Sequence, residues 1–390
     1  MDSISPTRTG AGSVAVDHVS VAESFGATAE EWADWRWHMR HRITSLAKLR
    51  QWIEVTPDEE SALLGTAGKY RMSITPYYAS LMDKTDPTCP IRQQAVPAME
   101  ELVTYAGSDV DPVDDRFYRK TNRVVHKYPD RVIMLITEAC PVYCRHCTRK
   151  FHTTDLSGTY FRDDEGGGFE EDYRYIAEHP EIRDVLLTGG DPLSYRDDKL
   201  EEIISRLREI PSVEIIRIGS RFPVLLPQRI TDEFCDMLSR YHPIWFNTHF
   251  NHPDEITEEA EAAIDRLLRR GIPVGNQSVL LKGINDDVAT MRRLLTELVR
   301  IRVRPYYLYH CDNVTGVSHF RTTVERGLEI IEGLQGHITG FAVPQYILTT
   351  RLGKIPLTRP AHEVVADGVL VRNYKNEQAL ITDLLIDEAP

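Results

Sequence analysis

The sequence lacks any apolar run that approaches the roughly 20 residues needed to cross a bilayer. Residues 1–27, rich in Ser, Thr, Ala and Gly, also lack the continuous apolar segment of a secretion signal. Positive charge is in deficit, because 46 Lys and Arg stand against 59 Asp and Glu, for a formal net charge of -13. Such a surface repels phosphate backbones. We therefore expect a cytoplasmic protein whose partners include neither a membrane nor a nucleic acid.

Cysteine is scarce as well, with six residues in 390, yet three of them share one short segment. Cys140, Cys144 and Cys147 form a CxxxCxxC pattern, which in a reducing compartment indicates metal binding rather than disulfides. Three thiolates can hold a [4Fe-4S] cluster and leave one iron open for a chelating small molecule. This is the signature of radical S-adenosylmethionine (SAM) enzymes, and we predict such a cluster here. A zinc site with His146 as fourth ligand is one alternative, and three unrelated buried thiols are another.

From about residue 131 the sequence alternates between β-prone apolar runs and amphipathic helical stretches. Within residues 200–207, for example, apolar residues follow the i, i+3, i+4, i+7 spacing of a helix that packs one face. Six β-then-α units favour a parallel sheet with right-handed crossovers, and six are too few for an eight-stranded barrel. We therefore predict an α/β fold, a partial (β/α)6 barrel. The expected strands lie at 132–138, 184–188, 213–219, 244–250, 273–281 and 302–309.

Four regions are expected along the chain. Residues 1–27 form a flexible N-terminus. Residues 28–125 form a helical region that packs on the barrel, and residues 126–338 form the barrel itself. Residues 339–390 are a less regular extension, with a short strand-like run at 343–348 and turn signals after it.

Polar residues gather after the predicted strands, and in a parallel barrel the chemistry sits at the carboxyl ends of strands. Gly189, Gly190 and Asp191 follow the second strand, where two glycines allow a ligand to approach the backbone closely. In radical SAM proteins a GGDP-like turn of this kind meets the methionine end of SAM. His249 ends the fourth strand, where a satisfied structural histidine is the alternative interpretation. Gln277 lies on the fifth strand, in a position suited to a SAM contact.

With these residues in place, the chain resembles the lysine 2,3-aminomutase family, whose members are radical SAM enzymes that also use pyridoxal 5′-phosphate (PLP). The resemblance runs from about residue 28 to residue 375, with the same segments in the same order. It is carried by WADWRWHMRHRI at 32–43, RMSITPYYASLMD at 71–83, CPVYCRHCTRK at 140–150, LLTGGDPL at 186–193, NTHFNHPDEIT at 247–257, GNQSVLLKGIND at 275–286, IRVRPYYLYHCD at 301–312 and GKIPL at 353–357.

The resemblance implies a PLP site in the C-terminal extension. Lys354 matches the lysine that binds PLP covalently, a reaction that needs an amine with a lowered pKa. An ordinary exposed loop lysine is the alternative. Lys127, Tyr128 and Arg131 match a segment near the PLP phosphate, where cationic side chains suit a dianion. Tyr309 matches another residue close to PLP.

The resemblance also implies substrate and SAM contacts. Arg149 matches the arginine that clamps the substrate carboxylate through a bidentate guanidinium fork. Asp312 matches one of two acidic residues that hold the distal ammonium of lysine. His249 and Gln277 match residues in contact with SAM.

The activity implied by this resemblance is that of an isomerase, an amino-acid 2,3-aminomutase. It would move the α-amino group of a free basic L-amino acid, lysine or arginine, to the β-carbon by way of a 5′-deoxyadenosyl radical. The cofactors would be a [4Fe-4S] cluster, SAM and PLP. The resemblance further implies an electron donor such as flavodoxin or ferredoxin, and a homo-oligomer.

Three departures from the family pattern bear on the substrate and the metals. Thr349 stands where the second substrate-binding acid is expected, which leaves Asp312 alone with a buried cation. Arginine then becomes a candidate, because a planar guanidinium can take both oxygens of one carboxylate. The glycine-rich run before the PLP lysine is shortened, and Arg351 in it is expected to add positive charge close to PLP or substrate, which could compensate for Asp312 if glutamate were bound. Asp287 stands in place of a zinc-binding cysteine, so we expect no zinc.

Other functions stay open at this point. The same cofactors could act on another amino acid or end in elimination. A radical SAM enzyme that modifies a lysine on a protein is a second possibility, although Asp312 favours a free amino acid. A non-catalytic cluster protein for electron transfer or sensing is a third, but Lys354 and Arg149 would have no role in it.

Overall fold

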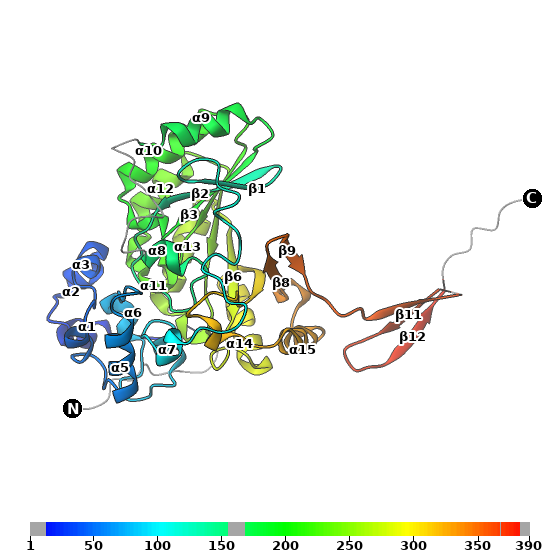
Figure 1. The fold of residues 1–390 in the computed structure, drawn as a ribbon, viewed down its shortest axis with the longest axis horizontal. Helices are drawn as coiled ribbons and strands as arrows, with labels where there is room; N and C mark the ends of the chain where they lie inside the picture. Colours follow the sequence, from blue (N-terminus) through cyan, green and yellow to red (C-terminus); the bar gives the residue numbers. More distant parts are fainter. Residues whose placement is uncertain (1–12, 155–167, 367, 383–390) are drawn as a thin grey trace, which may run out of the picture.

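The computed structural model describes residues 13–154, 168–366 and 368–382. A nine-stranded sheet runs through the centre in the order β1-β2-β3-β4-β5-β6-β7-β8-β9 (Figure 1). Strands β2 to β8 pair in parallel, whereas β1 and β9 add antiparallel at the two edges, so the sheet forms a partial barrel. The strands are β1 (Val124–Tyr128), β2 (Arg131–Thr137), β3 (Asp184–Gly189), β4 (Ile215–Gly219), β5 (Ile244–Thr248), β6 (Val274–Leu280), β7 (Arg304–His310), β8 (Gln345–Thr350) and β9 (Gly353–Pro356).

The six predicted strands are present as β2 to β7, which confirms the α/β class and the partial barrel. The strand-like run at 343–348 becomes β8, a seventh parallel strand beside β7. The chain then turns back through a tight hairpin into β9, which carries Lys354. Strand β9 was not predicted, because four residues of mixed polarity give no periodic signal of their own.

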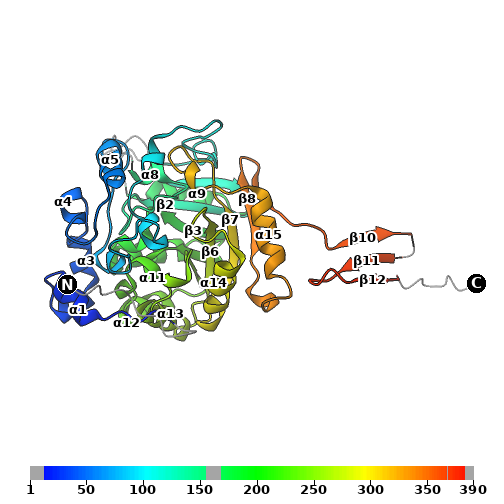
Figure 2. The ribbon, with the colours of Figure 1, turned by 90° about the horizontal axis from the view of Figure 1, so that it is seen from below.

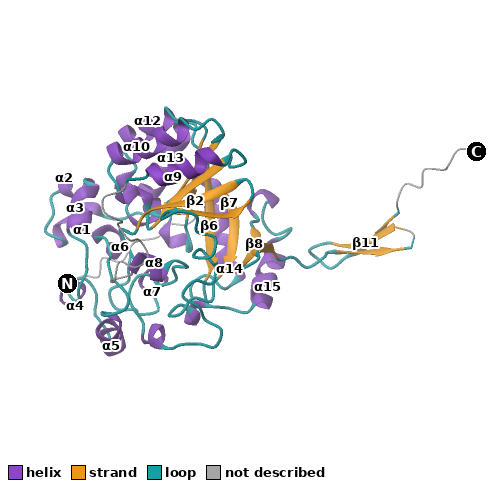
Figure 3. Ribbon diagram, turned by 45° about the horizontal axis from the view of Figure 1, so that its top comes forward, coloured by secondary structure: helices purple, strands orange, loops and turns teal. Residues whose placement is uncertain are grey.

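Amphipathic helices cover the outer face of the sheet (Figures 2 and 3). In α10 the apolar residues that follow the helical spacing are all buried, as predicted. On β3, Val185 and Leu187 are fully buried, while the alternate side chains of Leu186 and Thr188 line an internal cavity. The helices of this layer and its connections are α8 (Lys150–Thr154), α9 (Glu170–Glu178), α10 (Asp197–Arg208), α11 (Phe222–Leu225), α12 (Asp232–Ser239), α13 (Glu258–Arg269), α14 (Val288–Arg300) and α15 (Val324–Leu334).

The region expected to be helical before the barrel consists of short helices separated by capping residues. Asp34 ends α2 and begins α3, where its carboxylate accepts from the backbone N–H of Arg36 at 3.0 Å. Ser45 caps α4 in the same way. The helices are α2 (Ala29–Ala33), α3 (Trp35–Arg40), α4 (Leu46–Leu49), α5 (Pro57–Thr66), α6 (Pro76–Ser80), α7 (Pro90–Gln93) and the 3-10 turn η1 (Met99–Leu102). One further helix, α1 (His18–Ser24), lies before them, within the segment expected to be a flexible N-terminus.

This N-terminal region braces the segment that carries the three cysteines, residues 138–149, hereafter the cysteine loop. Arg42 donates from Nη1 to the carbonyl of Cys140 at 3.1 Å. Ser73 donates from its hydroxyl to the carbonyl of Pro141, also at 3.1 Å. A loop that cannot form its own regular hydrogen bonds is thus held by side chains from a distant part of the chain.

Beyond β9 the chain leaves the barrel and forms a second, three-stranded antiparallel sheet that projects from the body (Figure 1). The less regular extension expected from the sequence contains this small sheet. Among the described residues, no helix combines the length and apolar character needed to span a bilayer. The strands of the projecting sheet are β10 (His362–Val365), β11 (Gly368–Arg372) and β12 (Gln378–Ile381).

Candidate active site

A cavity of about 670 Å³ occupies the barrel interior. It reaches residues that follow the carboxyl ends of β2, β3, β5 and β7, and it extends to β9 at the sheet edge. Apart from Arg351, the residues that the sequence predicts for the site all line it, so the fold brings these distant segments together. The residues are Lys127, Tyr128, Arg131, Cys140, Cys144, Cys147, Arg149, Gly189, Gly190, Asp191, His249, Gln277, Tyr309, Asp312, Thr349 and Lys354.

Cys140, Cys144 and Cys147 are free thiols that line this one cavity. Burial raises the pKa of Cys147 to about 11 and that of Cys140 well above its ordinary value. Iron binding requires thiolates, so it would release these protons. Each thiolate of a four-iron cluster binds a different iron, and the sulfurs need not converge on one point. Among the described residues, no three His, Cys, Asp or Glu side chains are arranged around a single metal ion.

His146, inside the cysteine loop, offers a direct test of whether a cluster fits. Its Nε2 faces the amide Nδ2 of Asn251 at 3.2 Å, and since an amide nitrogen can only donate, Nε2 accepts and Nδ1 carries the proton. Burial lowers the pKa of His146 well below its ordinary value, so the ring is neutral. Nδ1 has no hydrogen-bond partner among the described residues, although a buried unpaired N–H is costly. His146 lines the cavity, and a sulfide or thiolate of a cluster bound there would offer an acceptor, so the residues present fit the cluster.

The glycine pair at the end of β3, Gly189 and Gly190, is required by close backbone packing. A Cβ on Gly190 would lie 2.5 Å from the carbonyl oxygen of Ala139, in the cysteine loop, and Gly189 has a φ of +125°. Asp191 then accepts from the backbone N–H of Arg221 at 2.7 Å, and burial raises the pKa of Asp191 to about 6. The GGDP turn therefore locks the cysteine loop to β3 and to the end of β4, beside any ligand in the cavity.

His249 and Gln277 are joined by a hydrogen bond that fixes the histidine tautomer. Nδ1 of His249 donates to the backbone carbonyl of Gln277 at 2.9 Å, because a carbonyl oxygen only accepts. Nε2 is left as an acceptor, and burial lowers the pKa of His249 to about 4. The ring is neutral at physiological pH and can receive a hydrogen bond from a ligand amine or hydroxyl.

Lys354 lies on β9 with its ammonium open to the cavity. Nζ donates to the hydroxyl of Tyr309 at 2.7 Å, and the backbone N–H donates to the hydroxyl of Tyr128 at 3.0 Å. Burial lowers the pKa of Lys354 to about 8, and nearby arginines, Arg217 foremost, contribute to that shift. Gly353 adopts a φ of +119° to make this approach, which a side chain would strain. A lysine with a lowered pKa is a competent nucleophile.

Three further cations line the cavity near Lys354. Lys127 donates from Nζ to two backbone carbonyls, that of Val113 at 3.0 Å and that of Thr350 at 2.9 Å. Its ammonium therefore joins the loop that contains Val113 to the β8–β9 hairpin. Arg131 lies over the ring of Tyr128, with the guanidinium carbon 4.1 Å from the ring centroid. Arg217, which was not predicted from the sequence, completes the set.

The position of Arg217 could have been read from the sequence. Ile216 and Ile218 on either side of it are fully buried, so strand alternation turns Arg217 to the inner face of β4. There Nε donates to Asp184 at 2.8 Å. An arginine in the middle of an apolar strand is the signal that was missed.

Arg149 and Asp312 stand near each other in the cavity, and each is held by a neighbour. Nε of Arg149 donates to Oδ2 of Asp115 at 2.8 Å. Thr148 donates from its hydroxyl to Oδ2 of Asp312 at 2.7 Å, and burial raises the pKa of Asp312 to about 6. Thr349 also lines the cavity, directly opposite Lys354 in the hairpin register. Asp115 comes from a loop without periodicity, and no sequence signal pointed to it.

Arg351 does not occupy the position expected for it. It lies at the tip of the β8–β9 hairpin, does not line the cavity, and its side chain is 65% exposed. Its guanidinium pairs with Asp109 at 2.7 Å and with Asp114 at 3.6 Å. The expectation that Arg351 adds charge near PLP or substrate is therefore wrong, because the tight turn points the side chain outward.

The barrel, the cysteine loop and the cavity are those of a radical SAM enzyme, and the profile of the radical SAM superfamily matches residues 134–295. The L-lysine 2,3-aminomutase of Fusobacterium nucleatum is 49% identical over 366 residues, which cover 90% of this chain and 85% of that protein. The chain belongs to the lysine 2,3-aminomutase family and is an amino-acid 2,3-aminomutase.

Two other relatives show the range of the family. The L-lysine 2,3-aminomutase of Clostridium subterminale is 48% identical over 351 residues, covering 88% of this chain and 83% of that protein. The glutamate 2,3-aminomutase of Clostridioides difficile is 42% identical over 360 residues, covering 91% and 84%. Membership in the radical SAM superfamily implies a [4Fe-4S] cluster and SAM. Overall identity does not choose between a basic and an acidic substrate.

Proposed function

We propose that this enzyme moves the α-amino group of a free basic L-amino acid, lysine or arginine, to the β-carbon. It would use a [4Fe-4S] cluster on Cys140, Cys144 and Cys147, with SAM, PLP and an external electron donor such as flavodoxin or ferredoxin, and no zinc. The observation that carries the proposal is a single cavity lined by these thiols, by the Lys354 amine and by Asp312. When bound, SAM and PLP supply the radical and the electron sink for the amino migration.

The chain itself contributes a nucleophile at one end of this arrangement. Near neutral pH, a pKa of about 8 keeps an appreciable fraction of Lys354 unprotonated. Tyr309 and Tyr128 fix the amine and its backbone, so that the group is oriented before any ligand arrives. Arg131, Arg217 and Lys127 give this part of the cavity the positive charge that a phosphate requires.

The substrate is proposed to lie between Arg149 and Asp312. Arg149 offers its Nη atoms to the α-carboxylate, while Asp115 holds Nε. Asp312, whose carboxylate is oriented by a hydrogen bond from the Thr148 hydroxyl, would bind the charged end of the substrate side chain. The same carboxylate would repel glutamate, and Arg351 lies outside the cavity and cannot compensate. Charge therefore favours a basic substrate even though a glutamate enzyme is among the relatives.

Lysine and arginine make different demands on this pocket. An ammonium has three donors that need acceptors from several directions, whereas a guanidinium can meet one carboxylate edge-on with two parallel bonds. Asp312 with the hydroxyl of Thr349 offers one carboxylate and one neutral acceptor. Both substrates stay within the proposal, and their relative turnover measures which geometry the pocket fits.

The test is anaerobic turnover by the full-length chain after cluster reconstitution. The protein is incubated with SAM, PLP and dithionite, and with lysine, arginine or glutamate in parallel, and β-amino products are identified by mass analysis. We expect a β-amino product from lysine or arginine and none from glutamate. Lys354→Ala, as the matched control, should retain the iron–sulfur spectrum but lose borohydride-trapped PLP and turnover. Turnover of glutamate alone would overturn the assignment of Asp312.

A further inference from the structure

Arg221 places a buried cation beside one of the predicted cluster ligands. It lies two residues beyond the end of β4, and Nη1 donates to the sulfur of Cys144 at 2.8 Å. Nε donates to the backbone carbonyl of His249 at 2.9 Å. Nη2 donates to Oε1 of Gln94 at 2.5 Å and to Oε1 of Glu255 at 2.7 Å. Four of the five N–H donors of the guanidinium are thereby engaged.

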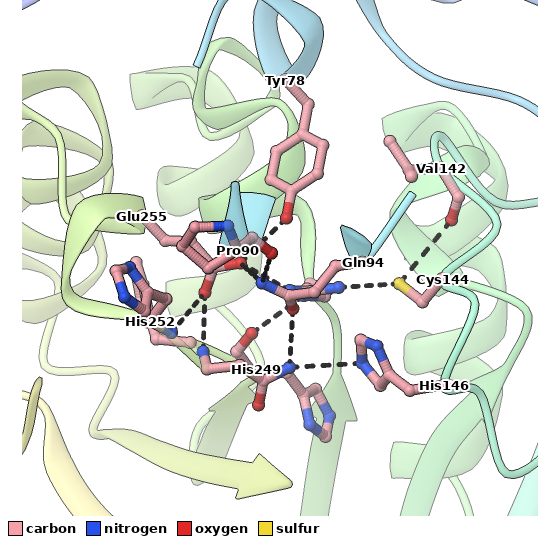
Figure 4. A network of polar contacts seen from close by, with 12 residues as sticks. Tyr78, Pro90, Gln94, Val142, Cys144, His146, His249, His252 and Glu255 are labelled. Atoms are coloured by element: carbon pink, nitrogen blue, oxygen red, sulfur yellow. Dashed lines mark hydrogen bonds and ion pairs between the residues drawn. The ribbon is translucent and has the colours of Figure 1, made fainter. Parts of the chain in front are cut away.

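Glu255 anchors this network from the opposite side (Figure 4). Its side chain is fully buried, and Oε1 also accepts from the hydroxyl of Tyr78 at 2.9 Å and from Nε2 of Gln94 at 3.0 Å. Oε2 accepts from the backbone N–H of Asn251 at 2.6 Å. Both oxygens accept hydrogen bonds, so the side chain is fixed in place, and it forms a buried ion pair with Arg221.

A buried ion pair of this kind is a weak source of stability, since desolvation of both charges offsets their attraction. The contacts with Gln94, Glu255 and His249 explain how the guanidinium is fixed, and the remaining bond goes to the sulfur of Cys144, which lines the cavity. Figure 4 shows Cys144 and His146 on the same side of this network. The network thus holds the Arg221 guanidinium in hydrogen-bond contact with Cys144, whose sulfur is an iron ligand in the proposed function.

We propose that Arg221 is a positioning residue for the cluster: fixed by Glu255, it donates a hydrogen bond to the Cys144 sulfur and raises the reduction potential of the [4Fe-4S] centre. The inference rests on the proposed function for its cluster. A donor to a ligating sulfur disperses the negative charge that reduction adds, so the reduced state is stabilised. Hydrogen bonds from a charged donor are roughly twice as strong as neutral ones.

Substitution of Arg221 and substitution of Glu255 should shift the midpoint potential of the cluster in opposite directions. A merely structural role of the ion pair predicts no such opposition. Arg221→Met removes the donor and the positive charge, so the midpoint potential should become more negative. Glu255→Gln leaves Arg221 without its counter-charge and should shift the potential to more positive values. The double variant, Arg221→Met with Glu255→Gln, keeps local neutrality and isolates the loss of the hydrogen bond, so its midpoint should also lie below that of the native protein.

The experiment is an EPR-monitored redox titration of the reconstituted full-length protein, without SAM or amino acid. Arg229→Met is the matched control, because Arg229 is equally buried, pairs with Asp197 and does not line the cavity. Its potential should equal that of the native protein. Equal potentials for Arg221→Met, the double variant and the native protein, at equal iron and sulfide content, would overturn the inference.

Thermal unfolding of the apo protein separates a folding defect from an effect on the cluster. If Arg221→Met does not fold, Arg221→Lys and the double variant carry the test, since lysine keeps the charge but loses the fork. Arg221→Lys should have an intermediate potential, and a native value for both variants would contradict the inference. Absence of any cluster in the native protein would instead remove the proposed function, so the two failures are distinct.

Discussion

Asp115 accepts a hydrogen bond from Nε of Arg149 at 2.8 Å. The Nη atoms of that guanidinium form no hydrogen bond with the described residues. We expect Asp115→Ala to raise the KM for the amino acid about 10-fold, with a smaller change in kcat, because a charged hydrogen bond contributes about 1.5 kcal/mol or more. Asp115→Asn retains an acceptor oxygen and should lie close to the native enzyme. Steady-state kinetics with both variants measure this, and native kinetics for Asp115→Ala would show that Arg149 needs no anchor.

The pKa of Lys354 sets the pH dependence of PLP attachment. Burial and Arg217 lower that pKa to about 8, and only the unprotonated amine attacks PLP. The rate of PLP attachment should therefore rise as pH increases through about 8 and level off above it. Stopped-flow absorbance on the apo protein, with borohydride trapping, gives this profile. A flat profile between pH 6 and 10 would mean that another step limits the rate.

Arg217→Gln should move the same profile. Removing the foremost nearby cation makes the protonated form of Lys354 less unfavourable, so the midpoint shifts to higher pH. Arg206→Gln is the matched control, because that side chain pairs on the surface with Glu170 and is not near the cavity. A midpoint that moves equally in both variants would point to a general charge effect.

Much of this site could be predicted from the sequence because the chemistry is attached to strand ends. Strand periodicity placed Gly189, His249 and Asp312 at the ends of the second, fourth and sixth predicted parallel strands, and such ends meet at one rim of a barrel. The residues then share a cavity whatever the loop details are. Cys140, Cys144 and Cys147 could be predicted as cluster ligands from their spacing alone.

The contacts that could not be predicted join segments with no shared period. Glu255 lies 34 residues from Arg221, in the short 3-10 turn η4 (Pro253–Glu255), and only tertiary packing brings their charged groups to 2.7 Å. The prediction for Arg351 failed because its closeness to Lys354 in sequence was taken to mean closeness in space. A two-residue turn reverses the chain, and Thr350 pairs with Gly353 so that Arg351 points away.

Asp312→Asn should abolish most activity on a basic amino acid. A substrate cation left without a charged partner in a buried pocket loses about 2 kcal/mol or more, or at least roughly 30-fold in kcat/KM. Thr349→Asp is the complementary change, since it places a second carboxylate opposite Lys354. It should improve lysine relative to arginine, because an ammonium gains most from a second acceptor.

Competition between the two amino acids in one reaction gives the ratio of kcat/KM directly. Asp109→Asn serves as the control, because Asp109 pairs with Arg351 at the surface and does not line the cavity. An unchanged lysine-to-arginine ratio in Thr349→Asp would show that the side-chain pocket lies elsewhere. Full activity of Asp312→Asn on lysine and arginine would likewise show that Asp312 does not bind the substrate side chain.

Glu101 ties the cysteine loop to the N-terminal region through a buried charge network, and this network should make stability depend on pH. Oε1 accepts from Nε of Arg145 at 2.8 Å, and Oε2 accepts from Nζ of Lys150 at 2.6 Å. Burial alone would raise the pKa of Glu101, but Arg145 and Lys150 outweigh it and lower the pKa to about 2. Glu101→Gln leaves two buried cations without their anionic partner and should cost about 3 kcal/mol of unfolding free energy at pH 7.

The sign of the pH effect is set by the depressed pKa. The folded carboxylate holds its charge down to about pH 2, whereas the unfolded one takes up a proton near its ordinary value of 4.5. The advantage of the native protein over Glu101→Gln is therefore complete above about pH 4.5 and declines as pH falls toward 2. Urea unfolding of both proteins from pH 7 to pH 3 measures the difference, and exposed Glu100→Gln is the matched control. A difference that stays constant over this range would mean that Glu101 acts through its shape rather than its charge.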